Sequence, residues 1–199
     1  MNPPAFKDPG FEMAVRLRKV IDVRENTLAG HLDRVAAYSC AIARMLGLPE
    51  DMVEQLNYAA PLHDIGKLLL DTAIIDTPTR LNRRERAVME THTTLGFDIL
   101  KDSQWPVIQC AARIARSHHE NWDGSGYPDG LAGTDIPLEA RIVAVADVYD
   151  ALLSERSYKR AWTLKETLGE IQRLKGIKFD PEIIDQFLKH LPEPIASAA

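Results

Sequence analysis

The sequence predicts a single all-α domain, a helical bundle with one long Gly-rich loop. Apolar residues recur at helical spacing along almost the whole chain, and no segment shows the strict alternation that is typical of a half-buried strand. The chain has 199 residues, which is enough to bury one core, and no Pro-, Gly- or Ser-rich linker divides it. We therefore expect one domain over residues 23–191, an N-terminal helix or extension over residues 1–22 and a flexible tail over residues 192–199.

The helices in the first part of the chain are expected at about 11–23, 27–46 and 49–60. Their apolar residues are spaced three and four positions apart, as on one face of a helix. Gly47 lies where a C-terminal cap belongs. Pro61 should kink or end the third helix, because its ring does not fit a helix interior.

Capping boxes mark two further helix starts. Asn82 and Thr163 are each followed three residues later by Glu, an arrangement in which the two side chains satisfy backbone N–H groups. The first of these helices should continue through His92 and Gly96, and the second should stop at Gly176. The other helices are expected at about 106–119, 137–154 and 181–191.

Two segments are expected to be irregular. Residues 68–81 carry only short apolar pieces. Residues 121–137 are rich in Gly and Pro and form the longest irregular segment, which must be a structured loop. Long ordered loops in compact domains often carry function.

Composition and charge exclude several classes of protein. The chain is 45% hydrophobic and 27% charged, which argues against intrinsic disorder. A net charge of −5 disfavours binding to duplex nucleic acid, although it does not exclude a small anionic ligand. Cys40 and Cys110 stand far apart, which predicts two buried thiols in a reducing compartment. With no signal-like N-terminus and no apolar stretch long enough to span a bilayer, we expect a cytoplasmic protein.

The histidines are the first candidates for chemistry. Five of the six lie near helix faces or ends that also carry acids, and the sixth, His190, should be solvated. The five are His31, His63, His92, His118 and His119. Imidazole suits transition metals, and a mixed set of His and Asp favours Fe, Mn or Zn over Ca or Mg.

Acidic residues complete this pattern. Asp64 has two carboxylate oxygens, so it could bridge two metals about 3.5–4 Å apart, as in two-metal hydrolysis. Asp147 lies in an apolar stretch and needs a partner, and Asp150, one turn later, points to roughly the same side. Taken singly, each of these His and Asp residues is more often structural than a ligand. A metal site requires them to converge in space.

Two strings of sequence carry a resemblance to a known family. They are His63-Asp64-Ile65-Gly66-Lys67 and the longer, highly specific His118-His119-Glu120-Asn121-Trp122-Asp123-Gly124-Ser125-Gly126-Tyr127-Pro128. Further matches lie at Asp147-Val148-Tyr149-Asp150, at Arg156-Ser157-Tyr158-Lys159 and at Phe179-Asp180-Pro181. Over about residues 23–187 the chain resembles the HD-GYP family, a branch of the HD-domain metal-dependent phosphohydrolases. The resemblance implies an HD-domain helical bundle whose Gly-rich segment is the GYP loop.

The resemblance also implies a dinuclear metal centre. One ion would take His31, His63, Asp64 and Asp147, and the second would take the other oxygen of Asp64 with His92, His118 and His119. Family members bind two or three ions, commonly iron or manganese. Because Thr27 stands where some members have a Glu that helps to hold a third ion, we expect two divalent ions, Fe or Mn.

The implied activity is hydrolysis of cyclic di-GMP to linear pGpG, to GMP or to both. Asp64 and Lys67 would be catalytic. The residues that would bind substrate are Lys67, Gly126, Tyr127, Asp150, Arg156 and Lys159. Two alternatives stay open. The chain could be a slow or inactive sensor that contacts a GGDEF-type diguanylate cyclase through the GYP loop, or it could act on a related cyclic dinucleotide.

Overall fold

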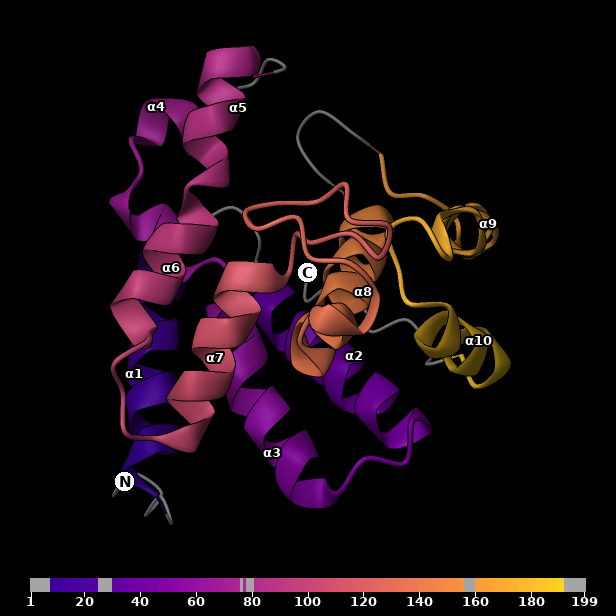
Figure 1. Ribbon diagram of the computed structural model, residues 1–199, viewed down its shortest axis with the longest axis horizontal. Helices are drawn as coiled ribbons and strands as arrows, with labels where there is room; N and C mark the ends of the chain where they lie inside the picture. The colour runs from indigo at the N-terminus through magenta and orange to yellow at the C-terminus, as the bar shows by residue number, and fades with distance from the viewer. Residues whose placement is uncertain (1–7, 25–29, 76, 78–80, 156–159, 192–199) are drawn as a thin grey trace.

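The computed structural model describes residues 8–24, 30–75, 77, 81–155 and 160–191 (Figure 1). All regular elements within these ranges are helices, which confirms the all-α prediction. In chain order they are α1 (Pro9–Arg24), α2 (His31–Met45), α3 (Glu50–Ala59), the short 3-10 helices η1 (Ala60–Leu62) and η2 (Ile65–Leu69), α4 (Thr72–Ile75), α5 (Arg83–Glu90), α6 (His92–Leu100), α7 (Pro106–Ser117), the 3-10 helix η3 (Gly133–Asp135), α8 (Leu138–Leu153), α9 (Leu164–Leu174) and α10 (Pro181–Lys189).

Helix α8 lies in the middle of the bundle and contacts α2, α7 and α9 (Figure 1). Its segment Ile142–Ala146 is buried on every side, since a helix that is apolar all round must be covered all round. Helices α1 and α6 pack on α7 at one side, and α10 packs on α2 and α9 at the other. Ala14 and Ile21 of α1 belong to the same core as the rest. Among the described residues no helix has the length and apolarity that crossing a bilayer requires.

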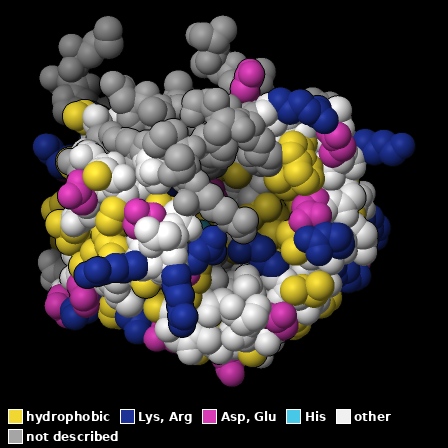
Figure 2. All heavy atoms as spheres, turned by 90° about the horizontal axis from the view of Figure 1, so that it is seen from above, with side chains coloured by type: hydrophobic (Ala, Val, Ile, Leu, Met, Phe, Trp, Pro, Cys, Tyr) yellow, Lys and Arg dark blue, Asp and Glu magenta, His cyan; other side chains and the backbone are white. Residues whose placement is uncertain are grey.

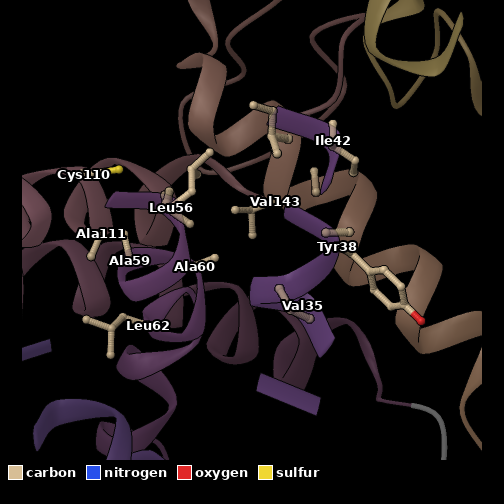
Figure 3. Close-up of a cluster of buried hydrophobic side chains, with 14 of the residues drawn as sticks. Val35, Tyr38, Ile42, Leu56, Ala59, Ala60, Leu62, Cys110, Ala111 and Val143 are labelled. Carbon is tan, nitrogen blue, oxygen red and sulfur yellow. The ribbon is translucent and has the colours of Figure 1, made fainter. Parts of the chain in front are cut away.

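Small side chains let the helices approach one another closely. Ala59 and Ala60, at the end of α3 and in η1, and Ala111 of α7 are fully buried in the core shown in Figure 3. Tyr38 and Tyr149 meet edge to face across α2 and α8, with ring centroids 4.9 Å apart. The two thiols, Cys40 and Cys110, are buried and free, as predicted.

Most predicted boundaries hold. Asn82 and Thr163 each form the complete capping box, and Gly47 adopts a φ of 70° just after α2. Helix α3 ends at Ala59, and the chain continues through Pro61 as the 3-10 helix η1, as the proline predicts. The expected start of α2 near Thr27 and the tail at 192–199 lie outside the described residues.

The helix expected to run unbroken from Asn82 through Gly96 is instead divided at Thr91 into α5 and α6. Four consecutive side chains, those of residues 91–94, each bond to the backbone carbonyl three positions earlier. Such bonds compete with the helical ladder, which explains the break. The division sets His92 at the first position of α6, facing the bundle.

The 3-10 helix η2 packs directly on the backbone of α6 at Gly66. A Cβ atom at this position would lie 1.9 Å from the carbonyl oxygen of His92 and 2.5 Å from the amide nitrogen of Gly96. Only a residue without a side chain allows this approach. The contact brings Asp64, two residues before Gly66, next to the beginning of α6.

We predict that Gly66→Ala lowers the free energy of unfolding by about 3 kcal/mol, because the added methyl group must separate η2 from α6. Gly169→Ala is the matched control. Gly169 lies in the middle of α9 with open space around its Cα, so alanine there should raise stability by about 0.5–1 kcal/mol. Urea denaturation followed by circular dichroism measures both, and equal stability of Gly66→Ala and the wild type would contradict the close contact.

Candidate metal centre

The predicted metal ligands converge at one end of the bundle, although they come from separate elements. His31 begins α2, His63 and Asp64 follow η1, His92 begins α6, His118 and His119 follow α7, and Asp147 lies within α8. Figure 2 looks down on this end, the upper side of Figure 1, where Lys and Arg side chains border a hollow in the surface.

The converging residues form two groups. In each group, one nitrogen or carboxylate oxygen per residue lies within 4.8 Å of those of the other members. The first group is Asp64, His92, His118 and His119, and the second is His31, His63 and Asp147. In the second group Nε2 of His31 lies 3.6 Å from Oδ1 of Asp147. Mixed sets of imidazole and carboxylate could each hold a transition-metal ion.

The carboxylate of Asp64 lies between the two groups. Its Oδ1 faces Nε2 of His92 at 3.2 Å and Nε2 of His118 at 3.6 Å. Its Oδ2 faces Nε2 of His63 at 3.3 Å. The two oxygens of one side chain therefore point at different groups, which is the geometry that a carboxylate bridging two ions requires.

Hydrogen bonds on the far ring nitrogen fix the direction of three imidazoles. Nδ1 of His63 and Nδ1 of His92 each donate to the carbonyl three residues earlier, at 2.9 and 2.6 Å. Nδ1 of His118 donates to the carbonyl four residues earlier, at 3.0 Å. Because a carbonyl oxygen only accepts, these bonds place the proton on Nδ1 and turn Nε2 toward Asp64. In the neutral ring, Nε2 then carries the lone pair that a metal ion needs.

A buried carboxylate orients His31 in the same way. Oδ2 of Asp150 lies 2.7 Å from Nδ1 of His31, and Arg34 donates to both oxygens of Asp150. Asp150 is only 2% exposed, and His31, Arg34 and the hydroxyl of Ser154 occupy its carboxylate. The structure thus gives Asp150 a role in orienting His31, and the substrate contact expected of Asp150 stays a prediction. Asp150 orients His31, a candidate metal ligand, by a hydrogen bond to the ring nitrogen that does not face Asp147.

Two polar atoms at the centre fit a bound cation. Among the described residues, Nε2 of His63 and Oδ1 of Asp64 are buried and form no hydrogen bond. Buried polar atoms without a partner are destabilising and rare, and they are expected where an ion binds. The side chains present therefore fit a metal ion.

The electrostatics of the cluster also favour a cation. Burial alone would raise the pKa of Asp64, but Lys67 and His63 hold it well below its ordinary value, so this carboxyl is ionised. Burial lowers the pKa of His92 to about 4 and that of His119 well below its ordinary value, so both rings are neutral. Burial also acts to lower the pKa of His63, but Asp64 outweighs it and raises the value to about 9. A metal ion on His63 would take the place of that proton.

Lys67 connects the centre with the surface. Its Nζ pairs with Oδ2 of Asp64, and its side chain is 27% exposed. The ammonium group therefore lies beside the central carboxylate and is open to solvent on one side. No other residue of the HD string combines a positive charge with this access.

The side chain of Glu120 joins the beginning of the GYP loop to a later part of the same loop. The buried carboxylate of Glu120 accepts the N–H groups of Asp129 at 2.7 Å and Leu131 at 3.2 Å. A Cβ at Gly126 would lie 2.3 Å from the amide nitrogen of Asn121, so the absence of a side chain there serves the packing of the loop. Backbone contact thus requires glycine at position 126, and the substrate contact expected of Gly126 stays a prediction.

Tyr127 covers one ligand candidate. Its ring stacks on that of His119 with centroids 4.8 Å apart and planes 27° apart, and its amide donates to the carbonyl of His119 at 3.3 Å. The side chain is half-buried, and this burial raises the pKa of its hydroxyl. Tyr127 therefore presents one edge beside the metal centre.

Some expected residues are not placed by the structure. Thr27, Arg156 and Lys159 lie outside the described residues, so their roles stay predictions. Glu120 belongs to the longer motif, but the sequence analysis did not predict that its side chain anchors the GYP loop. It did not single out Lys178 either. The only sequence signal for Lys178 was its place directly before Phe179-Asp180-Pro181. His190 is exposed at the end of α10, as expected.

A helical domain that gathers His and Asp at one end, around an adjacent His-Asp pair, has the architecture of a metal-dependent HD domain. The model of the HD domain family matches residues 16–183, and the chain belongs to this family. Solved structures support the fold, among them the HDG"Y"P protein Bd1817 of Bdellovibrio bacteriovorus, with a TM-score of 0.63, 21% identity and coverage of 83% of this chain and 52% of that chain.

The chain is 45% identical over 178 residues to the cyclic di-GMP phosphodiesterase response regulator RpfG of Xanthomonas campestris, covering 89% of this chain and 47% of that protein. It is 40% identical over 194 residues to the 3'3'-cGAMP-specific phosphodiesterase 2 of Vibrio cholerae, covering 98% and 37%. The fold is similar to the crystal structure of V-cGAP3, a cyclic GMP-AMP-specific phosphodiesterase of V. cholerae, with a TM-score of 0.68, 23% identity and coverage of 92% and 49%. The chain thus spans half or less of the length of these proteins.

We predict that Asp150→Asn weakens metal binding by about tenfold to a hundredfold at the group of His31, His63 and Asp147, because an amide oxygen cannot serve both His31 and Arg34. Metal content measured by mass spectrometry after dialysis against a graded chelator should fall, while the group around His92 keeps its ion. Asp129→Asn, which changes an exposed partner of Arg116, is the control and should retain full metal content. Wild-type metal content in Asp150→Asn would refute the orienting role.

Proposed function

We propose that this chain is the catalytic domain of a metal-dependent phosphodiesterase that hydrolyses cyclic di-GMP to linear pGpG, GMP or both. One observation carries the proposal, namely that the two oxygens of Asp64 face different groups of imidazoles. Two ions bridged by one carboxylate can act on both sides of a phosphoryl group. The identity of 45% to a protein named as a cyclic di-GMP phosphodiesterase supports the substrate.

Two divalent ions, Fe or Mn, are the proposed cofactors. Their ligands would be His31, His63, Asp64, His92, His118, His119 and Asp147. When bound, such ions would neutralise charge on the phosphoryl oxygens and lower the pKa of a water molecule, so that the water can lose a proton and attack phosphorus. The mixture of imidazole and carboxylate supports Fe or Mn over Ca or Mg.

The protein's own residues hold this arrangement rigid. The hydrogen bonds from Nδ1 of His63, His92 and His118 to backbone carbonyls keep each ring in place, so little reorganisation is needed when charge develops on the substrate. Lys67 stands beside Asp64 with one side open, where it would hold a phosphoryl oxygen. Arg156 and Lys159 would add positive charge, and the edge of Tyr127 would lie against the nucleotide.

A related cyclic dinucleotide is the second candidate substrate. The observation that favours it is the 40% identity, over 98% of the chain, to a phosphodiesterase named for 3'3'-cGAMP. Both substrates present the same pair of phosphodiesters to the centre and differ in one base. The contact between the GYP loop and a diguanylate cyclase stays a prediction.

The test is turnover by the purified protein, loaded anaerobically with Fe or Mn and given cyclic di-GMP or 3'3'-cGAMP. We expect linear products, and we expect Asp64→Asn to reduce kcat by about a thousandfold or more, because an amide cannot bridge two cations. His190→Ala changes an exposed His away from the centre and should keep full activity. Full activity of Asp64→Asn would contradict the proposed role of Asp64 as the carboxylate shared by two ions. Nucleotide binding without turnover in the wild type would favour the sensor instead.

A further inference from the structure

Lys178 lies in a turn that is firmly fixed to the beginning of the GYP loop. The carbonyl oxygen of Leu174 accepts the N–H groups of Ile177, Lys178 and Phe179, which closes the turn between α9 and α10. The carbonyl oxygen of Lys178 in turn accepts the amide of Trp122 at 3.1 Å. The backbone of Lys178 is therefore held in place beside the segment that follows His118 and His119.

The side chain of Lys178 reaches toward the metal centre. Its Nζ lies 3.5 Å from the neutral Oδ1 of Asn121, and the side chain is half-buried. Burial lowers the pKa of Lys178, and the negative charge of Asp147 opposes this effect. Asn121 lies two residues after His119, so this contact places the ammonium group beside the ligand-bearing end of α7.

The other described cations beside the centre are already balanced by carboxylates. Lys67 pairs with Asp64, and Arg34 pairs with Asp150. Among the described residues, no carboxylate forms an ion pair with Lys178, whose nearest polar partner is an amide. A half-buried ammonium that forms no ion pair is suited to bind an anionic group of a ligand.

The chemistry of the proposed substrate supplies that charge. A cyclic dinucleotide carries two phosphodiesters in one ring, each with one negative charge. While one phosphodiester is cleaved at the metal centre, the second must lie close by, because the ring joins them. Resting on the proposed function, we propose that Lys178 binds this second, uncleaved phosphodiester and so selects cyclic dinucleotides over simple phosphodiesters.

The test compares Lys178→Met with the wild type on two substrates. Cyclic di-GMP has a second phosphodiester, whereas bis(p-nitrophenyl) phosphate has only the one that is cleaved. We expect Lys178→Met to raise KM and Kd for cyclic di-GMP roughly tenfold to a hundredfold, the worth of a charge-assisted hydrogen bond, with little change in kcat. Turnover of bis(p-nitrophenyl) phosphate and metal content should be unchanged, and Lys178→Arg should recover much of the affinity.

Lys175→Met is the matched control. Lys175 lies in the same turn, but its Nζ pairs with Asp185 of α10, so this variant should bind cyclic di-GMP like the wild type. Equal affinity of Lys178→Met and the wild type for cyclic di-GMP would overturn the role of Lys178 and leave the proposed function intact. Equal losses on both substrates would overturn it as well. A wild type that binds no cyclic dinucleotide would overturn the proposed function together with this inference.

Discussion

A carboxylate taken out of water needs positive charge or hydrogen-bond donors close to it, and the carboxylate of Asp64 is such a group. Lys67 and His63 meet part of this need at Oδ2, whereas Oδ1 faces the imidazoles of His92 and His118 without a hydrogen bond to any described residue, as a site for a cation would. For this to happen, α2 and α6 must begin, and η1 and α7 must end, at the same place. The close contact at Gly66 completes the arrangement by seating η2 on α6. The ends of the helices are therefore set by the centre as much as by the core.

Local sequence predicted those parts of the fold that depend on near neighbours. The capping boxes at Asn82 and Thr163 and the effect of Pro61 need only a few adjacent residues, and they were confirmed. The break at Thr91 was not predicted, because hydrophobic spacing continues across it and the competing side-chain bonds leave no periodic signal.

In the candidate site, too, local sequence did not predict features that depend on residues distant along the chain. Its His and Asp residues could be named from the quoted motifs, whereas the roles of Asp150 and Lys178 depend on partners far along the chain. Asp150 meets His31 across 119 positions, and Lys178 meets Asn121 across 57. The net charge of −5 likewise gave no indication that Lys178 lies beside the centre with an amide oxygen as its hydrogen-bond partner. Charge summed over a chain does not describe the field at one site.

Under the proposed function, the anchoring of the GYP loop by Glu120 has a consequence for how nucleotide preference could evolve. Gly-rich loops commonly hold phosphate with their backbone N–H groups. Here Glu120 already occupies those of Asp129 and Leu131. Under the proposed function, the phosphodiesters would be bound by side chains beside the metal centre, those of Lys67 and Lys178, and not by these two N–H groups. Lys178 pairs with no candidate metal ligand among the described residues, so under the proposed function a substitution of Lys178 would change ligand preference without disturbing the loop or the metal centre, and selectivity and chemistry could change independently.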